Sequence, residues 1–212
     1  MPTSLFELFE RGGPVMWPIL LCSIFAAAIA LERLLVLARV EEDSSRLLTE
    51  VCRALEQRQL SHAETLAGKG EGPLAGMVRA GIRRYGRPRQ EVLEMLEEAA
   101  ALEMPALERH VPMLGTIAHL APLLGLLGTV TGLVRCFQVI QEKTSTVNPV
   151  NPSDLAGGIW EALLTTVFGL LVAIPAYALY NYLAVRISHI THHLELSACR
   201  LADLLSGEKG RG

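Results

Sequence analysis

The chain has 212 residues, of which 50% are hydrophobic and 19% are charged, and its formal net charge is -3. This balance argues against a nucleic-acid-binding protein, which needs a strongly basic face. Its long apolar runs are rare in soluble domains and favour a membrane protein. The four cysteines are scattered without a CxxC pair, so we expect them to act as small hydrophobic side chains.

The first thirteen residues predict a short amphipathic helix. In SLFELFERGGP, apolar side chains surround Glu7 and Glu10, a pattern typical of a helix that lies on a membrane surface. The GGP that follows should end this helix and let the chain turn into the bilayer. We therefore expect residues 1–13 to form an external N-terminal helix.

Three apolar runs are long enough to cross a bilayer, which takes about 20 helical residues. They predict transmembrane helices at residues 14–38, 111–140 and 155–185. Acidic residues rather than a basic segment precede the first run, which is also longer than a signal-peptide core, so we interpret it as a retained helix. The predicted fold is an all-α membrane protein with three transmembrane helices.

The charged segment 39–110 predicts a cytoplasmic helical domain that is interrupted at GKGEGP. The second and third runs exceed the hydrocarbon core, so they should either tilt in the bilayer or, as we expect, continue as long helical extensions into the cytoplasm. The tail 186–212 keeps a helical apolar pattern and should prolong the third span. The acidic positions of 91–98 are interpreted as a solvated face, with partner docking as the alternative.

The placement of lysine and arginine predicts the orientation in the membrane. The segment 39–110 and the tail hold most of these residues, whereas the loop 141–154 holds only Lys143. By the positive-inside rule, the segment 39–110 and the C-terminus are cytoplasmic, and the N-terminus and the loop 141–154 are external. Asn-Pro pairs in that loop predict turns.

The second span carries glycines and hydroxyls that are unusual in a membrane helix. Gly125, Gly128 and Gly132 should let another helix approach closely, because small residues at helical spacing favour packing in lipid. Thr129 and Thr131 either bond their own backbone carbonyls or provide polar groups for function. His119, near the end of the span, is interpreted as a packed or capped residue rather than a proton relay.

The third span carries an ionisable residue, Glu161, which is a functional candidate by default. The alternative places Glu161 at the outer interface, where water satisfies it. At about 100° per residue, Thr165 lies on the Glu161 face and Thr166 lies about 140° away, so an ideal helix cannot aim both Glu161 and Thr166 at one narrow pore. Arg135, near the outer end of the second span, could either repel cations or pair with Glu161. Pro175 removes a helix hydrogen bond and should disturb the span, and we group it with the packing glycines.

No nucleotide-binding, hydrolase or metalloprotease motif is present, so we predict no enzyme and no cofactor. The histidines at positions 189, 192 and 193 have a spacing that suits a metal, but no cysteine or carboxylate completes a convincing set. We therefore predict no metal site.

The segments APLLGLLGTVTGLVRCF and LAGGIWEALLTTVFGLLVAIPAYALYNY resemble the two signature helices of the MotA/TolQ/ExbB proton-channel family. The opening ELFERGGPVMWPILL and the ALERLLVL that closes the first span match the ExbB and TolQ branch. The resemblance implies a ring-forming homopentamer in the bacterial inner membrane. It also implies a single-span partner of the ExbD/TolR type inside the pore, and a further partner of the TonB/TolA type.

The resemblance also implies site residues and a function. Thr129 and Thr166 match the pore threonines of the family, and Glu161 matches its third-span glutamate. Thr165 adds a hydroxyl where relatives often have alanine, and it completes the candidate proton path. The implied function is a proton-channel or stator subunit that uses the proton motive force to energise transport or other work at the outer membrane. The alternative is a non-conducting membrane scaffold, whereas a secondary transporter would need an inverted repeat.

Overall fold

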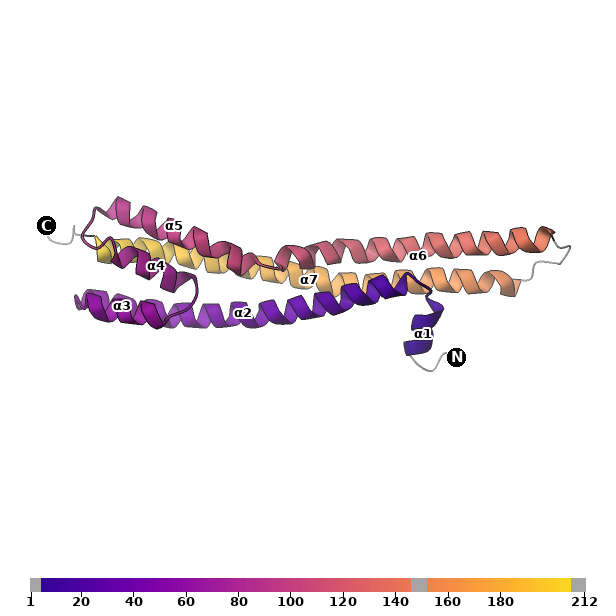
Figure 1. Ribbon diagram of the computed structural model, residues 1–212, viewed down its shortest axis with the longest axis horizontal. Coiled ribbons are helices and arrows are strands. Elements are labelled where there is room, and N and C mark those ends of the chain that lie inside the picture. Colours follow the sequence, from indigo (N-terminus) through magenta and orange to yellow (C-terminus); the bar gives the residue numbers. More distant parts are fainter. Residues whose placement is uncertain (1–4, 146–151, 207–212) are drawn as a thin grey trace. The chain divides into compact units, whose positions relative to one another are not determined.

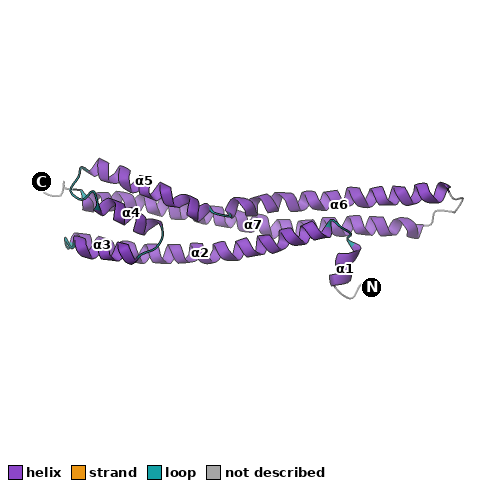
Figure 2. Cartoon of the chain, viewed as in Figure 1, coloured by secondary structure: helices purple, strands orange, loops and turns teal. Residues whose placement is uncertain are grey.

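The computed structural model describes residues 5–145 and 152–206, and within these ranges the chain forms helices and no strands (Figure 2). The helices are α1 (Leu5–Arg11), α2 (Met16–Glu56), α3 (Leu60–Lys69), α4 (Pro73–Ile82), α5 (Arg89–Glu108), α6 (Val111–Ser145) and α7 (Pro152–Leu205). Three stretches, in α2, in α5 with α6, and in α7, are long and apolar enough to cross a membrane. The predicted all-α class with three such helices is confirmed.

The chain divides into two compact units, which are described separately. Unit 1 contains residues 1–31 and 110–182, and unit 2 contains residues 32–109 and 183–212. Both α2 and α7 contribute to each unit, because neither helix ends at the division.

In unit 1, α1 is followed by a tight turn into the beginning of α2 (Figure 1). Gly13 makes this turn in the left-handed region, with a φ of 71°, where glycine is favoured because it lacks a Cβ. The ring of Phe9 in α1 meets the ring of Trp17 in α2 edge to face, with centroids 5.2 Å apart. The aromatic contact and the glycine turn together fix the direction in which α1 leaves α2.

Unit 1 exposes a large apolar surface on its long helices. Trp17, Leu127, Phe137, Leu171 and Ile174 are all exposed. Water would make such a surface unfavourable for a soluble monomer, whereas lipid or a neighbouring apolar helix would cover it at no cost. The exposed side chains are those that a membrane protein places outward.

The third span continues without interruption, because α7 extends through Pro175 to Leu205. Pro175 leaves the carbonyl of Leu171 without its usual helical donor, yet the helix does not end there. Span two differs from the expected long extension. Here α5 ends at Glu108 and α6 begins at Val111, and between them His110 takes a φ of 66°.

Unit 2 contains α3, α4, α5 and the distal parts of α2 and α7 (Figure 1). Its fully buried side chains are apolar and include Val51, Leu74, Met77, Val78, Val92, Leu96, Leu201 and Leu205. The N–H of Gly86 donates to the carbonyl of Leu205 at 2.9 Å, so the loop before α5 satisfies one of the open carbonyls at the end of α7. The chain also breaks before GKGEGP, because α2 ends at Glu56, α3 begins at Leu60, and Arg58 between them has a φ of 58°.

The α5–α6 junction is supported by an arginine from α2. Arg33 is buried within unit 2, and its Nη1 donates to the carbonyl of Ala106 at 3.2 Å. This carbonyl is one of the last four of α5, which have no intrahelical partner, and a cation is favourable at that end of the helix dipole. Arg33 also pairs with Glu32 at 2.6 Å.

The external loop expected at 141–154 is shorter than predicted, because α6 extends to Ser145 and α7 begins at Pro152. Most of the Asn-Pro turns expected there lie in 146–151, outside the described residues.

Candidate functional site

The helices α6 and α7 lie side by side in unit 1 with their backbones in close approach (Figure 1). A Cβ on Gly132 would lie 2.6 Å from the carbonyl oxygen of Gly158, and a Cβ on Gly169 would lie 2.7 Å from that of Ala121. A Cβ on Gly128 would overlap the side chain of Thr165. Glycine is therefore required at these contacts, because any larger residue would separate the helices.

Two of these glycines, Gly158 and Gly169 on α7, were not among the sequence-predicted residues. Their signal was present, because Gly158, Ala162, Thr165 and Gly169 repeat small side chains every three or four residues. The same span also carries Glu161 and Thr166, whose polar side chains are a stronger signal than this small-residue pattern. The close contact is thus encoded on both helices.

Thr165 and Thr166 both lie at this helix contact. The hydroxyl of Thr165 is buried and donates to the backbone of its own helix, 2.9 Å from the carbonyl of Ala162. The hydroxyl of Thr166 is 3.2 Å from the carbonyl of Gly125 on α6, so it donates across the helix pair. The two helices approach so closely that adjacent positions on α7 both touch α6.

The hydroxyls of the second span bond to their own backbone. Thr129 Oγ1 donates to the carbonyl of Leu126 at 2.6 Å, and Thr131 Oγ1 donates to the carbonyl of Gly128 at 3.0 Å. A hydroxyl that donates in this way keeps its acceptor lone pairs. The side chain of Thr129 is half-buried, so its oxygen is still accessible as an acceptor.

Glu161 forms an ion pair with Arg135, which reaches it from α6. Nη1 of Arg135 lies 2.7 Å from Oε1 and 2.5 Å from Oε2 of the carboxylate. The Glu161 side chain is only 11% exposed, whereas that of Arg135 is 50% exposed. The carboxylate also lies against Gly13, where a Cβ would overlap it. Glu161 is therefore held by protein contacts from α6 and from the turn at Gly13.

The role of Gly13 at this site has no signal in the sequence. The GGP motif predicts a turn, but nothing in it indicates that the turn packs on a carboxylate about 150 residues further along the chain. The contact brings together the N-terminal turn, α6 and α7 within unit 1.

His119 is exposed and contacts two residues of unit 1. Its Nδ1 is 2.7 Å from the carbonyl oxygen of Gly115, and its ring meets that of Tyr177 edge to face at 6.1 Å. Among the residues that the structure describes, no three His, Cys, Asp or Glu side chains are grouped to hold a metal ion.

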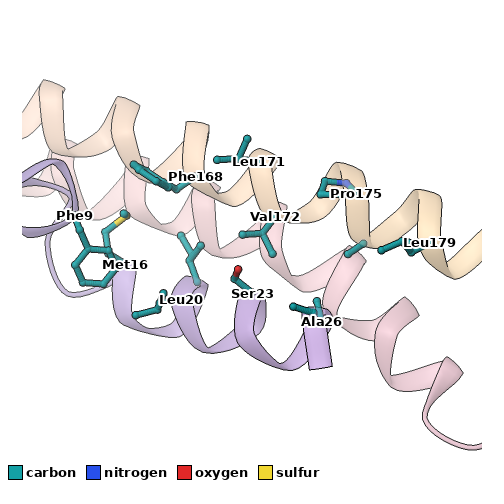
Figure 3. Close-up of a pocket in the computed structure, with 13 residues that line it drawn as sticks. Phe9, Met16, Leu20, Ser23, Ala26, Phe168, Leu171, Val172, Pro175 and Leu179 are labelled. Carbon is teal, nitrogen blue, oxygen red and sulfur yellow. The ribbon is translucent and has the colours of Figure 1, made fainter. Parts of the chain in front are cut away.

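A cavity of about 360 Å³ lies in unit 1 between the N-terminal part of α2 and α7 (Figure 3). Phe9, Met16, Phe168 and Pro175 are among its lining residues, and Ser23 is the one polar side chain of that lining. A site for a polar substrate needs several convergent polar groups. This cavity therefore lacks the chemistry of a substrate site.

Arg135, Glu161, Thr165 and Thr166 thus lie along one closely packed helix pair, α6 and α7, and we call these four residues the polar seam. This arrangement defines a multi-span membrane protein with a polar seam, the class to which ion-conducting proteins belong. Residues 69–196 match the MotA/TolQ/ExbB proton channel family, and the chain belongs to this family. The resemblance inferred from the two signature segments is confirmed.

Several relatives are similar over most of the chain. A biopolymer transport protein ExbB homologue of Methanothermobacter thermautotrophicus is 30% identical over 194 residues, which cover 91% of this chain and 67% of the relative. The biopolymer transport protein ExbB-like 3 of Synechocystis is 33% identical over 170 residues, 80% of each chain. The Tol-Pal system protein TolQ of Pseudomonas aeruginosa is 29% identical over 203 residues, covering 87% of this chain and 84% of TolQ.

Proposed function

We propose that the chain is the inner-membrane proton-channel or stator subunit of a motor of the ExbB–ExbD or TolQ–TolR type. Such a motor uses the proton motive force to energise transport or other work at the outer membrane. The observation that carries the proposal is the polar seam between α6 and α7, which lies within the segment that matches the proton channel family. The names of the relatives, biopolymer transport and Tol-Pal system proteins, support the same kind of work.

The proposed proton path contains Thr129, Glu161, Thr165 and Thr166. Protons cross an apolar region only where polar groups accept and donate hydrogen bonds, because isolated charges are costly there. The Thr166 hydroxyl already spans the two helices, and the Thr129 oxygen is half-buried with acceptor capacity left. These two hydroxyls are the first groups that we assign to the path.

The family likeness suggests the assembly. Five copies would form a ring around a single-span partner of the ExbD/TolR type, and a carboxylate on the partner helix would carry protons past Thr129 and Thr166. A TonB/TolA-like protein would pass the work to the outer membrane. The lysine and arginine distribution supports an external N-terminus, with the large loop and the C-terminus in the cytoplasm.

Proton flux into liposomes under an imposed pH gradient tests this proposal. The liposomes would contain the chain alone or the chain purified with its single-span partner. We expect flux that depends on the partner and that the substitutions Thr129→Ala and Glu161→Ala reduce in complexes that still assemble. The absence of flux from a well-assembled complex would support the non-conducting scaffold instead, and flux carried by sodium would retain the motor but change its ion.

A further inference from the structure

We propose that Arg135 is a positioning residue that holds Glu161 closed, so that the subunit conducts no protons through Glu161 until this ion pair separates. The inference rests on the proposed function, because it concerns the regulation of the same path. It assigns to Arg135 a task that differs from proton transfer.

The geometry of the pair leaves little of the Glu161 side chain exposed. Nη1 of Arg135 lies within 2.7 Å of both carboxylate oxygens of Glu161, which makes two charge-assisted hydrogen bonds. The backbone at Gly13 covers another side of the carboxylate, and the side chain of Glu161 is only 11% exposed. A proton can therefore reach this carboxylate only if one of these contacts opens.

Arg135 is the contact that can move. Its side chain is 50% exposed, whereas Gly13 belongs to the turn between α1 and α2, which the Phe9–Trp17 contact supports. A guanidinium remains protonated at every ordinary pH, so Arg135 cannot relay a proton itself. It acts through Glu161 alone, by occupying the oxygens that would otherwise accept protons.

The closed pair is also electrically neutral. Separation of its two charges in an apolar environment is costly, because each charge loses its partner without gaining full hydration. The pair should therefore suppress proton leakage through the subunit when no partner is bound.

The test is proton flux through liposomes that contain the chain without its partner. We expect low flux for the unchanged chain, and flux at least about tenfold higher for Arg135→Ala, because each lost charge-assisted hydrogen bond corresponds to about that factor and this variant removes two. Arg135→Gln keeps most of the side-chain length and should behave as Arg135→Ala. It replaces the alanine variant in this test if that variant does not assemble. Arg135→Lys should stay near the unchanged chain, because the ammonium group restores the charge opposite Glu161.

Two further variants separate this role from structural damage. The double variant Arg135→Ala/Glu161→Gln should return to low flux, because the freed carboxylate is gone, whereas leakage through a damaged ring would persist. Arg200→Ala is the matched control. It removes the cation of the exposed ion pair between Arg200 and Glu56, whose atoms lie 3.8 Å apart, and it should not change the flux. Size-exclusion chromatography would establish that each variant assembles.

The inference is overturned if Arg135→Ala and Arg135→Gln assemble and conduct no more than the unchanged chain. It is equally overturned if the leakage of Arg135→Ala persists in the double variant. Failure of the proposed function is a separate result, because it appears as an absence of flux when the unchanged chain is bound to its partner.

Discussion

At the scale of single residues, the packing of α6 against α7 in unit 1 depends on glycines, which have no side chain. Gly132 and Gly158 bring the backbones of α6 and α7 into contact, and Thr166 uses this proximity to donate to Gly125. Hydrogen bonds between membrane helices are individually modest, about 1 kcal/mol, so the packing surface must contribute as well. The polar seam therefore depends on the glycines that surround it.

Two adjacent glycines of α7 provide a matched test of this dependence. A Cβ on Gly158 would lie 2.8 Å from the carbonyl oxygen of Gly132, whereas a Cβ on Gly157 would meet nothing within 4 Å. Gly158→Ala should destabilise the protein by about 1–3 kcal/mol through overpacking. Gly157→Ala should be neutral or stabilising by up to about 1 kcal/mol, because alanine favours the helix.

Thermal unfolding of the two variants in detergent measures the difference. A lower midpoint for Gly158→Ala and an unchanged or higher midpoint for Gly157→Ala are expected. Equal midpoints for the two variants would show that α6 and α7 do not pack through Gly158.

At the scale of elements, apolar periodicity predicted the spans but not every place where a helix breaks. The three apolar runs and the continuation of α7 were readable, because long apolar stretches and their spacing are strong signals. The break at Arg58 was not readable, since a non-glycine residue takes the left-handed region there without a Gly or Pro signal. The boundary at His110 was readable, because the second apolar run begins at 111 and Pro112 follows. The bond from Thr166 to Gly125 was also hidden, because the two residues are 41 positions apart in the sequence and their contact depends on how α6 and α7 pack.

The α5–α6 junction yields a prediction for Arg33 within unit 2. Arg33→Ala removes the donor to the Ala106 carbonyl and the packing of a buried side chain, so we expect a loss of about 1–3 kcal/mol. The Nε of Arg33 is buried without a hydrogen-bond partner, so part of this loss is offset. Amide hydrogen exchange should become faster at the end of α5, and exchange that stays as slow as in the unchanged chain would contradict the capping role.

The thiols of unit 2 test the burial of the α2 extension. Burial raises the pKa of the Cys52 thiol, and the nearby Glu56 carboxylate also raises it, while Arg200 acts in the opposite direction. A raised pKa leaves less thiolate at a given pH, and the thiolate is the reactive form. In chains that keep one cysteine each, maleimide should label the exposed Cys199 quickly and the buried Cys52 slowly near neutral pH.

The raised pKa of Cys52 also predicts how its labelling rate depends on pH. The rate at Cys52 should continue to rise above pH 9, the ordinary pKa of a thiol, because its titration is displaced upward. Equal labelling rates for Cys52 and Cys199 in the folded chain would show that the end of α2 is not packed in unit 2.

At the scale of the whole molecule, exposed apolar surface and a polar seam occur together in unit 1. The exposed leucines and aromatic residues of α2, α6 and α7 suit lipid or neighbouring copies, and the seam suits the passage of an ion. The family was readable from the two signature segments, and the pairing of Arg135 with Glu161 was one of the sequence hypotheses, whereas the contact of Glu161 with Gly13 needed the folded chain. The central claim is that the hydroxyls of this seam carry protons.

Proton flux through the complex with its single-span partner, compared between Thr166→Val and Thr166→Ser, tests that claim most directly. Valine keeps the shape of threonine without its hydroxyl, and serine keeps the hydroxyl without the methyl group. Loss of one neutral hydrogen bond, about 1 kcal/mol, corresponds to about fivefold in rate, so Thr166→Val should reduce flux by about that factor while Thr166→Ser should stay near the unchanged complex. Equal flux in both variants, with assembly intact, would contradict a proton path through Thr166.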